Sequence, residues 1–127
     1  MATEVKPKLQ VEIGHVLFMD VVGYSTSSVD EQHEIQQQLN DIVRGTVQFR
    51  ATPADKLTIL PTRDGMALIF FTSPEAPVEC AIEISSELKT YPHVQLRMGI
   101  HSGPVSRTSD LNRRTNVAGA GINTPSE

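Results

Sequence analysis

The sequence contains only one cysteine, Cys80, and no long apolar run. A single cysteine excludes an internal disulfide bond and a zinc site of several thiolates, and it fits a reducing, intracellular environment. No segment has the length of a membrane-spanning helix, and residues 1–10 lack the apolar core of a signal peptide. We therefore expect a soluble, cytoplasmic protein with no membrane partner and a flexible N-terminus at residues 1–10.

Basic residues are also scarce, because the 127 residues include 11 Lys and Arg against 15 Asp and Glu, for a formal net charge of −4. They do not cluster beyond the pair Arg113 and Arg114, which is more typical of a solvated loop than of a phosphate clamp. This balance argues against a nucleic-acid partner. A polyanionic substrate would need a metal ion or hydrogen-bond donors placed locally.

What the chain does contain is an apolar run, HVLFMDVV, that carries one acid, Asp20, and is followed by Gly23, Tyr24 and Ser25. We predict a first strand at residues 11–22, buried on both faces because the run is apolar throughout. A buried carboxylate without a partner is costly, so we expect Asp20 at the strand's exit, within reach of a cation or of donors. The backbone N–H groups of the turn that follows could bind an anion.

Two amphipathic helices are predicted. The first begins with a capping box formed by Ser28 and Glu31. Its core-facing stripe is Ile35, Leu39, Ile42, Val43 and Val47. The second begins with Ser73 as N-cap followed by Pro74, and it ends before Pro92. Its predicted core-facing residues are Val78, Ala81, Ile82, Ser85 and Leu88.

Three further strands are predicted. Residues 56–62 and 66–71 form a hairpin around the turn Arg63-Asp64-Gly65. Apolar and polar residues alternate over residues 94–101, which indicates a half-buried strand. A turn at residues 102–104 is expected to end that strand, with a short strand following at residues 105–108.

The order strand, helix, strand, strand, helix, strand predicts a two-layer α+β sandwich with helices on one face of a mostly antiparallel sheet. Right-handed crossovers place the first and third strands side by side and opposed in direction. Asp20 and Asp64, 44 residues apart, should then be neighbours. Two adjacent carboxylates repel unless a cation lies between them, and magnesium suits such a pair. The alternative is that Asp64 is only a turn residue and Asp20 a capped strand end.

Three segments, residues 17–25, 64–70 and 96–103, together resemble the class III adenylate/guanylate cyclase catalytic domain, in the family's order. The resemblance extends over residues 11 to about 123 and defines a single domain at 11–127. It implies a ferredoxin-like fold, here incomplete at its C-terminal end, and a head-to-tail dimer with active sites at the interface. It also implies conversion of a nucleoside triphosphate into a 3′,5′-cyclic nucleotide and pyrophosphate.

By this resemblance Asp20 and Asp64 would hold two magnesium or manganese ions, helped by the carbonyl of Val21. The triphosphate would lie on the turn formed by Val22, Gly23, Tyr24 and Ser25. Asn123 would orient the ribose, and Leu60 and Asn116 occupy the positions that contact the base.

The chain departs from the family at four positions. Arg63 replaces a glycine before the second metal acid, and Leu60 replaces the base-reading lysine. Asn116 replaces an aspartate, and Glu127 takes the place of the arginine that stabilises the transition state.

Three functions remain open. The first is a nucleotidyl cyclase of intracellular signalling, acting on ATP rather than GTP as a homodimer. The second is a catalytically impaired homologue that binds nucleotide or dimerises with a complete cyclase domain. The third is a generic ferredoxin-like interaction module whose acids are structural.

Overall fold

The computed structural model describes residues 10–109 and 115–118. Its main elements follow the chain in the order β1 (Gln10–Val21), α1 (Val29–Arg44), α2 (Val47–Ala51), β2 (Leu57–Pro61), β3 (Gly65–Phe70), α3 (Glu75–Glu87), β4 (Leu96–Ser109) and β5 (Thr115–Ala118). Short 3-10 helices lie at η1 (Tyr24–Thr26), η2 (Ala54–Lys56) and η3 (Leu88–Thr90). None of the helices in these residues has the length and apolar content that crossing a bilayer requires.

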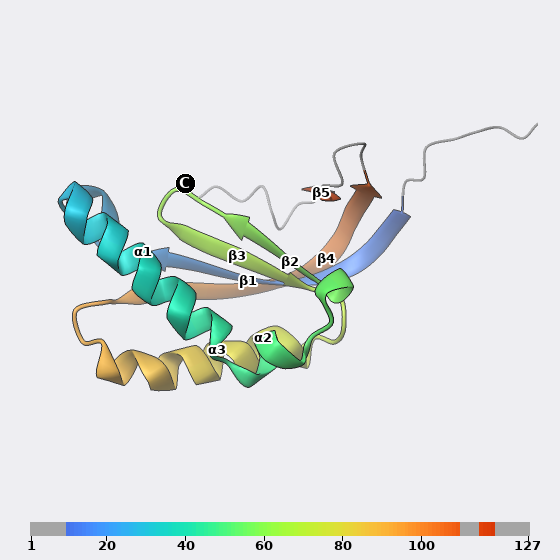
Figure 1. Cartoon of the computed structure of the whole chain (residues 1–127). Coiled ribbons are helices and arrows are strands. Elements are labelled where there is room, and N and C mark those ends of the chain that lie inside the picture. Colours follow the sequence, from blue (N-terminus) through green and yellow to red (C-terminus); the bar gives the residue numbers. More distant parts are fainter. Residues whose placement is uncertain (1–9, 110–114, 119–127) are drawn as a thin grey trace, which may run out of the picture.

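The five strands form one sheet in the order β2-β3-β1-β4-β5, and every neighbouring pair is antiparallel. Helices α1, α2 and α3 all lie on the same side of the sheet (Figure 1). We call the other side the helix-free face, which carries Val16, Phe18 and Asp20 of β1. This arrangement confirms the predicted two-layer α+β sandwich with a ferredoxin-like strand order.

Strand β1 is the centre of the sheet, because it pairs with β3 on one side and with β4 on the other. Leu17 and Met19 are buried in the core between the sheet and the helices. Val16 is buried in a smaller cluster on the helix-free face, with Ala67 and Ile69. The prediction that this strand is buried on both faces is confirmed for its middle, around Val16 and Leu17. It is wrong for its N-terminal part, where Val11 and Ile13 are 63% and 53% exposed.

Helix α1 begins as predicted. The Ser28 hydroxyl accepts a hydrogen bond from the Glu31 N–H at 3.2 Å, and the Glu31 carboxylate accepts one from the Ser28 N–H at 3.0 Å. The predicted core stripe is correct for Ile35, Leu39, Ile42 and Val43 but wrong for Val47, which is 58% exposed. The reason is that α1 ends at Arg44, with Gly45 as its C-cap, and a separate helix, α2, begins after Thr46 as N-cap. Val47 therefore does not continue the buried face of α1.

The predicted inner face of the second helix is correct for Ala81 and Leu88, which pack against the core, and wrong for Val78, Ile82 and Ser85. The buried residues are Ala76, Pro77, Cys80 and Ile84, whereas Val78 and Ile82 are 43% and 63% exposed. The helix presents mostly small side chains to the core, so the stripe of larger residues faces outward. The N-cap is Pro74 rather than Ser73, and it makes no side-chain capping hydrogen bond.

The predicted turn at residues 102–104 is also wrong, because β4 continues without interruption to Ser109. Its pairing with β1 runs from Val21 opposite Leu96 to Gln10 opposite Arg107. A long partner strand therefore keeps the backbone extended through Gly103 and Pro104. At the other end Val94 is buried but precedes the strand, which starts at Leu96.

Candidate functional site

Asp20 and Asp64 are brought together where β1 ends and β3 begins. Asp20 lies opposite Gly65 in the ladder between these strands, and the Val21 N–H donates a 2.8 Å hydrogen bond to the Asp64 carbonyl oxygen. The neighbouring positions expected from the strand order are therefore present. Whether the two side chains hold metal ions stays a prediction.

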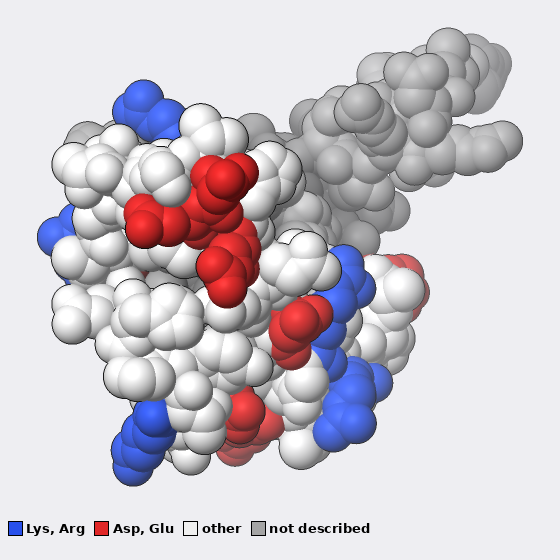
Figure 2. Space-filling model, turned by 60° about the vertical axis from the view of Figure 1, so that its left-hand side comes forward, with Lys and Arg blue, Asp and Glu red and all other residues white. Residues whose placement is uncertain are grey.

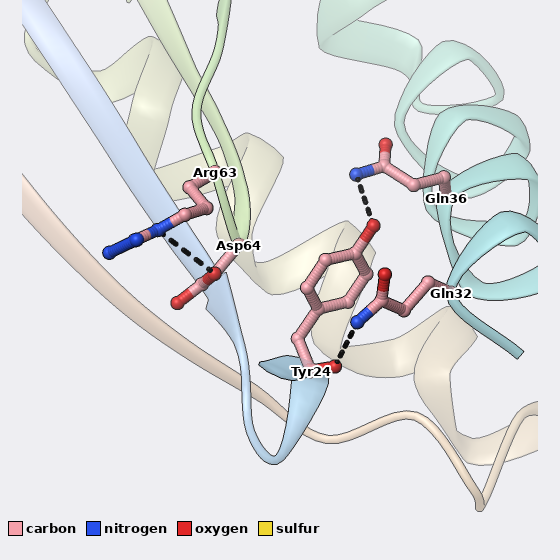
Figure 3. Close-up of polar contacts among 5 residues, drawn as sticks. All are labelled: Tyr24, Gln32, Gln36, Arg63 and Asp64. Carbon is pink, nitrogen blue, oxygen red and sulfur yellow. Dashed lines mark hydrogen bonds and ion pairs between the residues drawn. The ribbon is translucent and has the colours of Figure 1, made fainter. Parts of the chain in front are cut away.

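Both carboxylates are accessible to solvent. The Asp64 side chain is 40% exposed, and Asp20 is partly exposed. Because Met19 and Val21 point into the helix-side core, the alternation of the strand directs Asp20 to the helix-free face. In Figure 3 the Asp64 side chain likewise points away from α1. The described residues contain no group of three or more His, Cys, Asp or Glu side chains that could hold a metal. A metal ion at this site would therefore have only two carboxylate side chains of these residues, Asp20 and Asp64, as ligands.

Arg63 lies immediately beside this pair. Its Nε atom is 4.0 Å from Oδ1 of Asp64, and its side chain is 90% exposed (Figure 3). An ion pair this exposed contributes at most about 1 kcal/mol, so the arginine does not seal the carboxylate from solvent. The two acids remain reachable from outside.

The turn after β1 is held in place by α1. Gly23 adopts a left-handed conformation with φ 77°, which favours glycine. The Gln32 amide donates to the Tyr24 carbonyl at 2.8 Å, and the Gln36 amide donates to the Tyr24 hydroxyl at 3.2 Å (Figure 3). These bonds anchor the turn through its carbonyl and its aromatic ring.

The N–H groups of the same turn are largely free. Val22 donates its N–H to the Gln95 carbonyl at 2.9 Å. Within the described part of the chain, the N–H groups of Gly23, Tyr24 and Ser25 donate no hydrogen bond. Three successive unpaired N–H groups next to a strand end can bind an anionic oxygen. This geometry supports the phosphate-binding role predicted for the turn without testing it.

Arg97 is a candidate that the sequence analysis missed. It lies in β4 directly opposite Asp20, and it is exposed. Directly opposed residues of an antiparallel pair project to the same face, so Arg97 and Asp20 share the helix-free face. Arg97 occupies a polar position of the alternating fourth strand, and only the register with β1 reveals its acidic neighbour.

The two residues predicted to contact the base do not come together. Leu60 lies in β2 and packs against the cluster of Val16, Ala67 and Ile69 on the helix-free face. Asn116 lies in β5, opposite Thr108, and β2 and β5 are the two edges of the sheet. Asn123 and Glu127 lie outside the described residues.

A pocket of about 200 Å³ is found elsewhere, on the helix side, lined by parts of α1 and α3 and by Thr46 and Tyr91. None of the predicted site residues lines it. On the face shown in Figure 2, acidic side chains gather near the middle and basic ones lie toward the margins. The aspartate pair therefore remains the candidate site, where β1 ends and β3 begins.

No protein-family model and no curated protein matches the chain. Solved structures do. A bacterial light-regulated adenylyl cyclase is 18% identical, with a TM-score of 0.67 over 90% of this chain and 67% of that one. The guanylyl cyclase domain of the RhoGC fusion protein from the aquatic fungus Blastocladiella emersonii is 20% identical, with a TM-score of 0.63 over 94% and 73%.

A third structure is the catalytic core of a rhodopsin-guanylyl cyclase with converted specificity, in complex with ATPalphaS. It is 19% identical, with a TM-score of 0.59 over 91% of this chain and 71% of that one. These similarities extend over nearly the whole chain at identities that establish architecture rather than activity. The chain has the fold of the adenylyl and guanylyl cyclase catalytic domains.

Proposed function

We propose that the chain is a class III nucleotidyl cyclase domain that converts a nucleoside triphosphate, ATP in preference to GTP, into a 3′,5′-cyclic nucleotide and pyrophosphate. The observation that carries this proposal is the pair Asp20 and Asp64, held at adjacent strand ends with both side chains accessible. Similar structures include adenylyl and guanylyl cyclases, and one of them contains ATPalphaS. We place this activity in cytoplasmic signalling.

The residues present fit a pair of divalent ions. Magnesium and manganese take oxygen ligands, and magnesium is commonly bound by one or two carboxylates together with substrate phosphates. Asp20 and Asp64 supply those carboxylates, with the Val21 carbonyl as a further oxygen. Two such ions, when bound, would increase the acidity of the ribose 3′-hydroxyl and neutralise charge on the phosphates.

The reaction forms a bond from the ribose 3′-oxygen to the α-phosphorus and breaks the bond from that phosphorus to the pyrophosphate oxygen. The 3′-hydroxyl proton passes to solvent. In this scheme the unpaired N–H groups of Gly23, Tyr24 and Ser25 bind phosphate oxygens. Val22 supports the same turn through its N–H, which donates to the Gln95 carbonyl. The guanidinium of Arg97, opposite Asp20, adds a cation that can make two parallel hydrogen bonds to phosphate.

Recognition of ribose and base falls to residues other than the aspartate pair. We assign ribose orientation to Asn123 and base contact to Leu60 and Asn116. Leu60 offers no hydrogen bond, so the base would be held mainly by apolar contact on that side. Because Leu60 and Asn116 lie on opposite edges of the sheet, we propose that a second copy, or a complete cyclase domain, completes the site in a dimer.

The test is to incubate the purified protein with ATP or GTP and Mn²⁺ and to measure cyclic nucleotide by mass spectrometry. We expect product from the wild type and roughly a hundredfold less from Asp20→Asn and Asp64→Asn, because each replaces a charged metal-binding carboxylate with a neutral amide. Asp30→Asn, an exposed acid in the first turn of α1, is the matched control and should retain activity. Product that is unchanged in both site variants would refute the proposal.

A second candidate is a catalytically impaired homologue that binds nucleotide without turning it over. It is favoured by the ion pair between Arg63 and Asp64, because the positive charge of the arginine lies beside a carboxylate that we assign to the metal. Calorimetry that detects metal-dependent nucleotide binding, in a protein that forms no cyclic product, would favour this candidate over the first.

A further inference from the structure

The side chain of Arg63 has the carboxylate of Asp64 as its ion-pair partner. The Nε to Oδ1 distance is 4.0 Å, and the guanidinium is almost fully exposed, at 90%. The two groups differ in how firmly they are held. Asp64 is fixed through its backbone carbonyl, which accepts the Val21 N–H, whereas the Arg63 side chain makes no other polar contact within the described residues. The arginine can therefore leave while the aspartate stays.

A divalent ion and the Arg63 guanidinium compete for the same carboxylate. A cation at Asp64 lies within a few ångströms of the guanidinium charge, and like charges at that range repel even in water. The exposed pair with Asp64 is itself weak, so the competition changes metal affinity by about three- to fivefold rather than abolishing binding.

A bound triphosphate changes this balance. The turn with unpaired N–H groups directly follows β1, at the same end of the sheet as Asp64, so a triphosphate bound there would bring its phosphates near Arg63. Phosphate oxygens accept paired hydrogen bonds from a guanidinium, which makes them a better partner than a carboxylate 4.0 Å away. The arginine would then move from Asp64 to the nucleotide and release the carboxylate for the metal.

We propose that Arg63 couples metal binding to nucleotide binding: it weakens binding of the free divalent ion and strengthens binding of the metal–nucleotide complex. This inference rests on the proposed function and adds a regulatory property of the same site, the Asp20 and Asp64 pair. Such coupling is reciprocal, so the metal improves nucleotide affinity by the same factor as the nucleotide improves metal affinity.

The experiment compares wild type with Arg63→Gln, which removes the charge while keeping a long polar side chain. Binding of free Mn²⁺ is measured by electron paramagnetic resonance. Binding of the Mn²⁺ complex of α,β-methylene ATP, which resists cleavage at the α-phosphorus, is measured by calorimetry. We expect Arg63→Gln to bind free Mn²⁺ about three- to fivefold more tightly and the nucleotide complex about tenfold more weakly.

Arg50→Gln, an exposed arginine of α2, is the control and should leave both affinities unchanged. A rise in affinity for free Mn²⁺ together with a fall in affinity for the nucleotide complex is the result expected if Arg63 moves from Asp64 to the phosphates. Affinities that are unchanged, or that both rise or both fall, overturn the inference. A separate result would refute the proposed function itself: equal affinity of Asp64→Asn and wild type for Mn²⁺.

Discussion

The Val21 N–H and the Asp64 carbonyl oxygen are joined by a 2.8 Å hydrogen bond, which links the end of β1 to the turn of the β2–β3 hairpin, directly before β3. Because the link is made by backbone atoms, the relative position of Asp20 and Asp64 does not depend on any side chain. It depends instead on how closely the two backbones can approach. Gly65, which pairs with Asp20, is the residue at this approach.

Gly65→Ala should disrupt the site through the backbone. A Cβ atom at this position would overlap the carbonyl oxygen of Met19 and lie 2.8 Å from the Met19 carbonyl carbon. These atoms belong to β1 and cannot rotate away, so the strands must move apart. We expect the free energy of unfolding, measured by urea denaturation, to fall by about 1–3 kcal/mol, with loss of metal binding.

Gly99→Ala is the matched control, because a Cβ atom built at Gly99 in β4 meets nothing within 4 Å. Its free energy of unfolding should stay within about 0.5 kcal/mol of wild type. Equal stability of the Gly65 and Gly99 variants would contradict the close approach of β1 and β3.

Tyr24→Phe should loosen the turn that we assign to phosphate binding. The change removes the hydroxyl that accepts the Gln36 amide and leaves that partly buried amide without its partner. We expect a loss of about 0.5–1.5 kcal/mol in the free energy of unfolding and weaker nucleotide binding in calorimetry.

Tyr91→Phe provides the comparison for Tyr24→Phe, since the Tyr91 hydroxyl makes no hydrogen bond within the described residues. It should be the milder substitution in both measurements. If the two variants lose the same stability, the Tyr24 hydroxyl does not anchor the turn.

The Cys80 thiol should give stability a pH dependence in the alkaline range. Burial raises the pKa of Cys80 above its ordinary value of 9.0; the hydrogen bond with Thr46 opposes this, and the charge of Glu83 adds to it. The unfolded chain therefore loses the thiol proton at lower pH than the folded chain. The free energy of unfolding should fall as pH rises from about 9 toward the folded pKa.

Urea denaturation at about pH 8 and about pH 10 measures this effect. Cys80→Ala lacks the titrating group, so its stability should fall less over the same interval. A disulfide-exchange reagent should also fail to label Cys80 in the native protein at about pH 8, because the thiolate is the reactive form. Rapid labelling of the native protein would contradict the burial.

The two errors in the predicted helices have separate physical causes. Val47 continues the spacing of the first helix, but Gly45 and Thr46 end that helix and reset the phase. In α3 the stripe through Val78 and Ile82 is as regular as the one through Cys80 and Ile84, and only packing against the sheet selects between them. Periodicity identifies a helix but does not choose its buried side when both sides carry apolar residues.

The sequence alone was enough to predict the kind and order of most elements, the start of α1, and the proximity of Asp20 and Asp64. These follow from local chemistry and chain connectivity: apolar periodicity, a capping pair, a hairpin dipeptide and right-handed crossovers. The tertiary structure alone decided that β4 passes through Pro104, that Arg97 lies opposite Asp20, and that Leu60 and Asn116 lie on opposite edges. Those relationships depend on strand register and edge order, which are set by residues far apart in the chain.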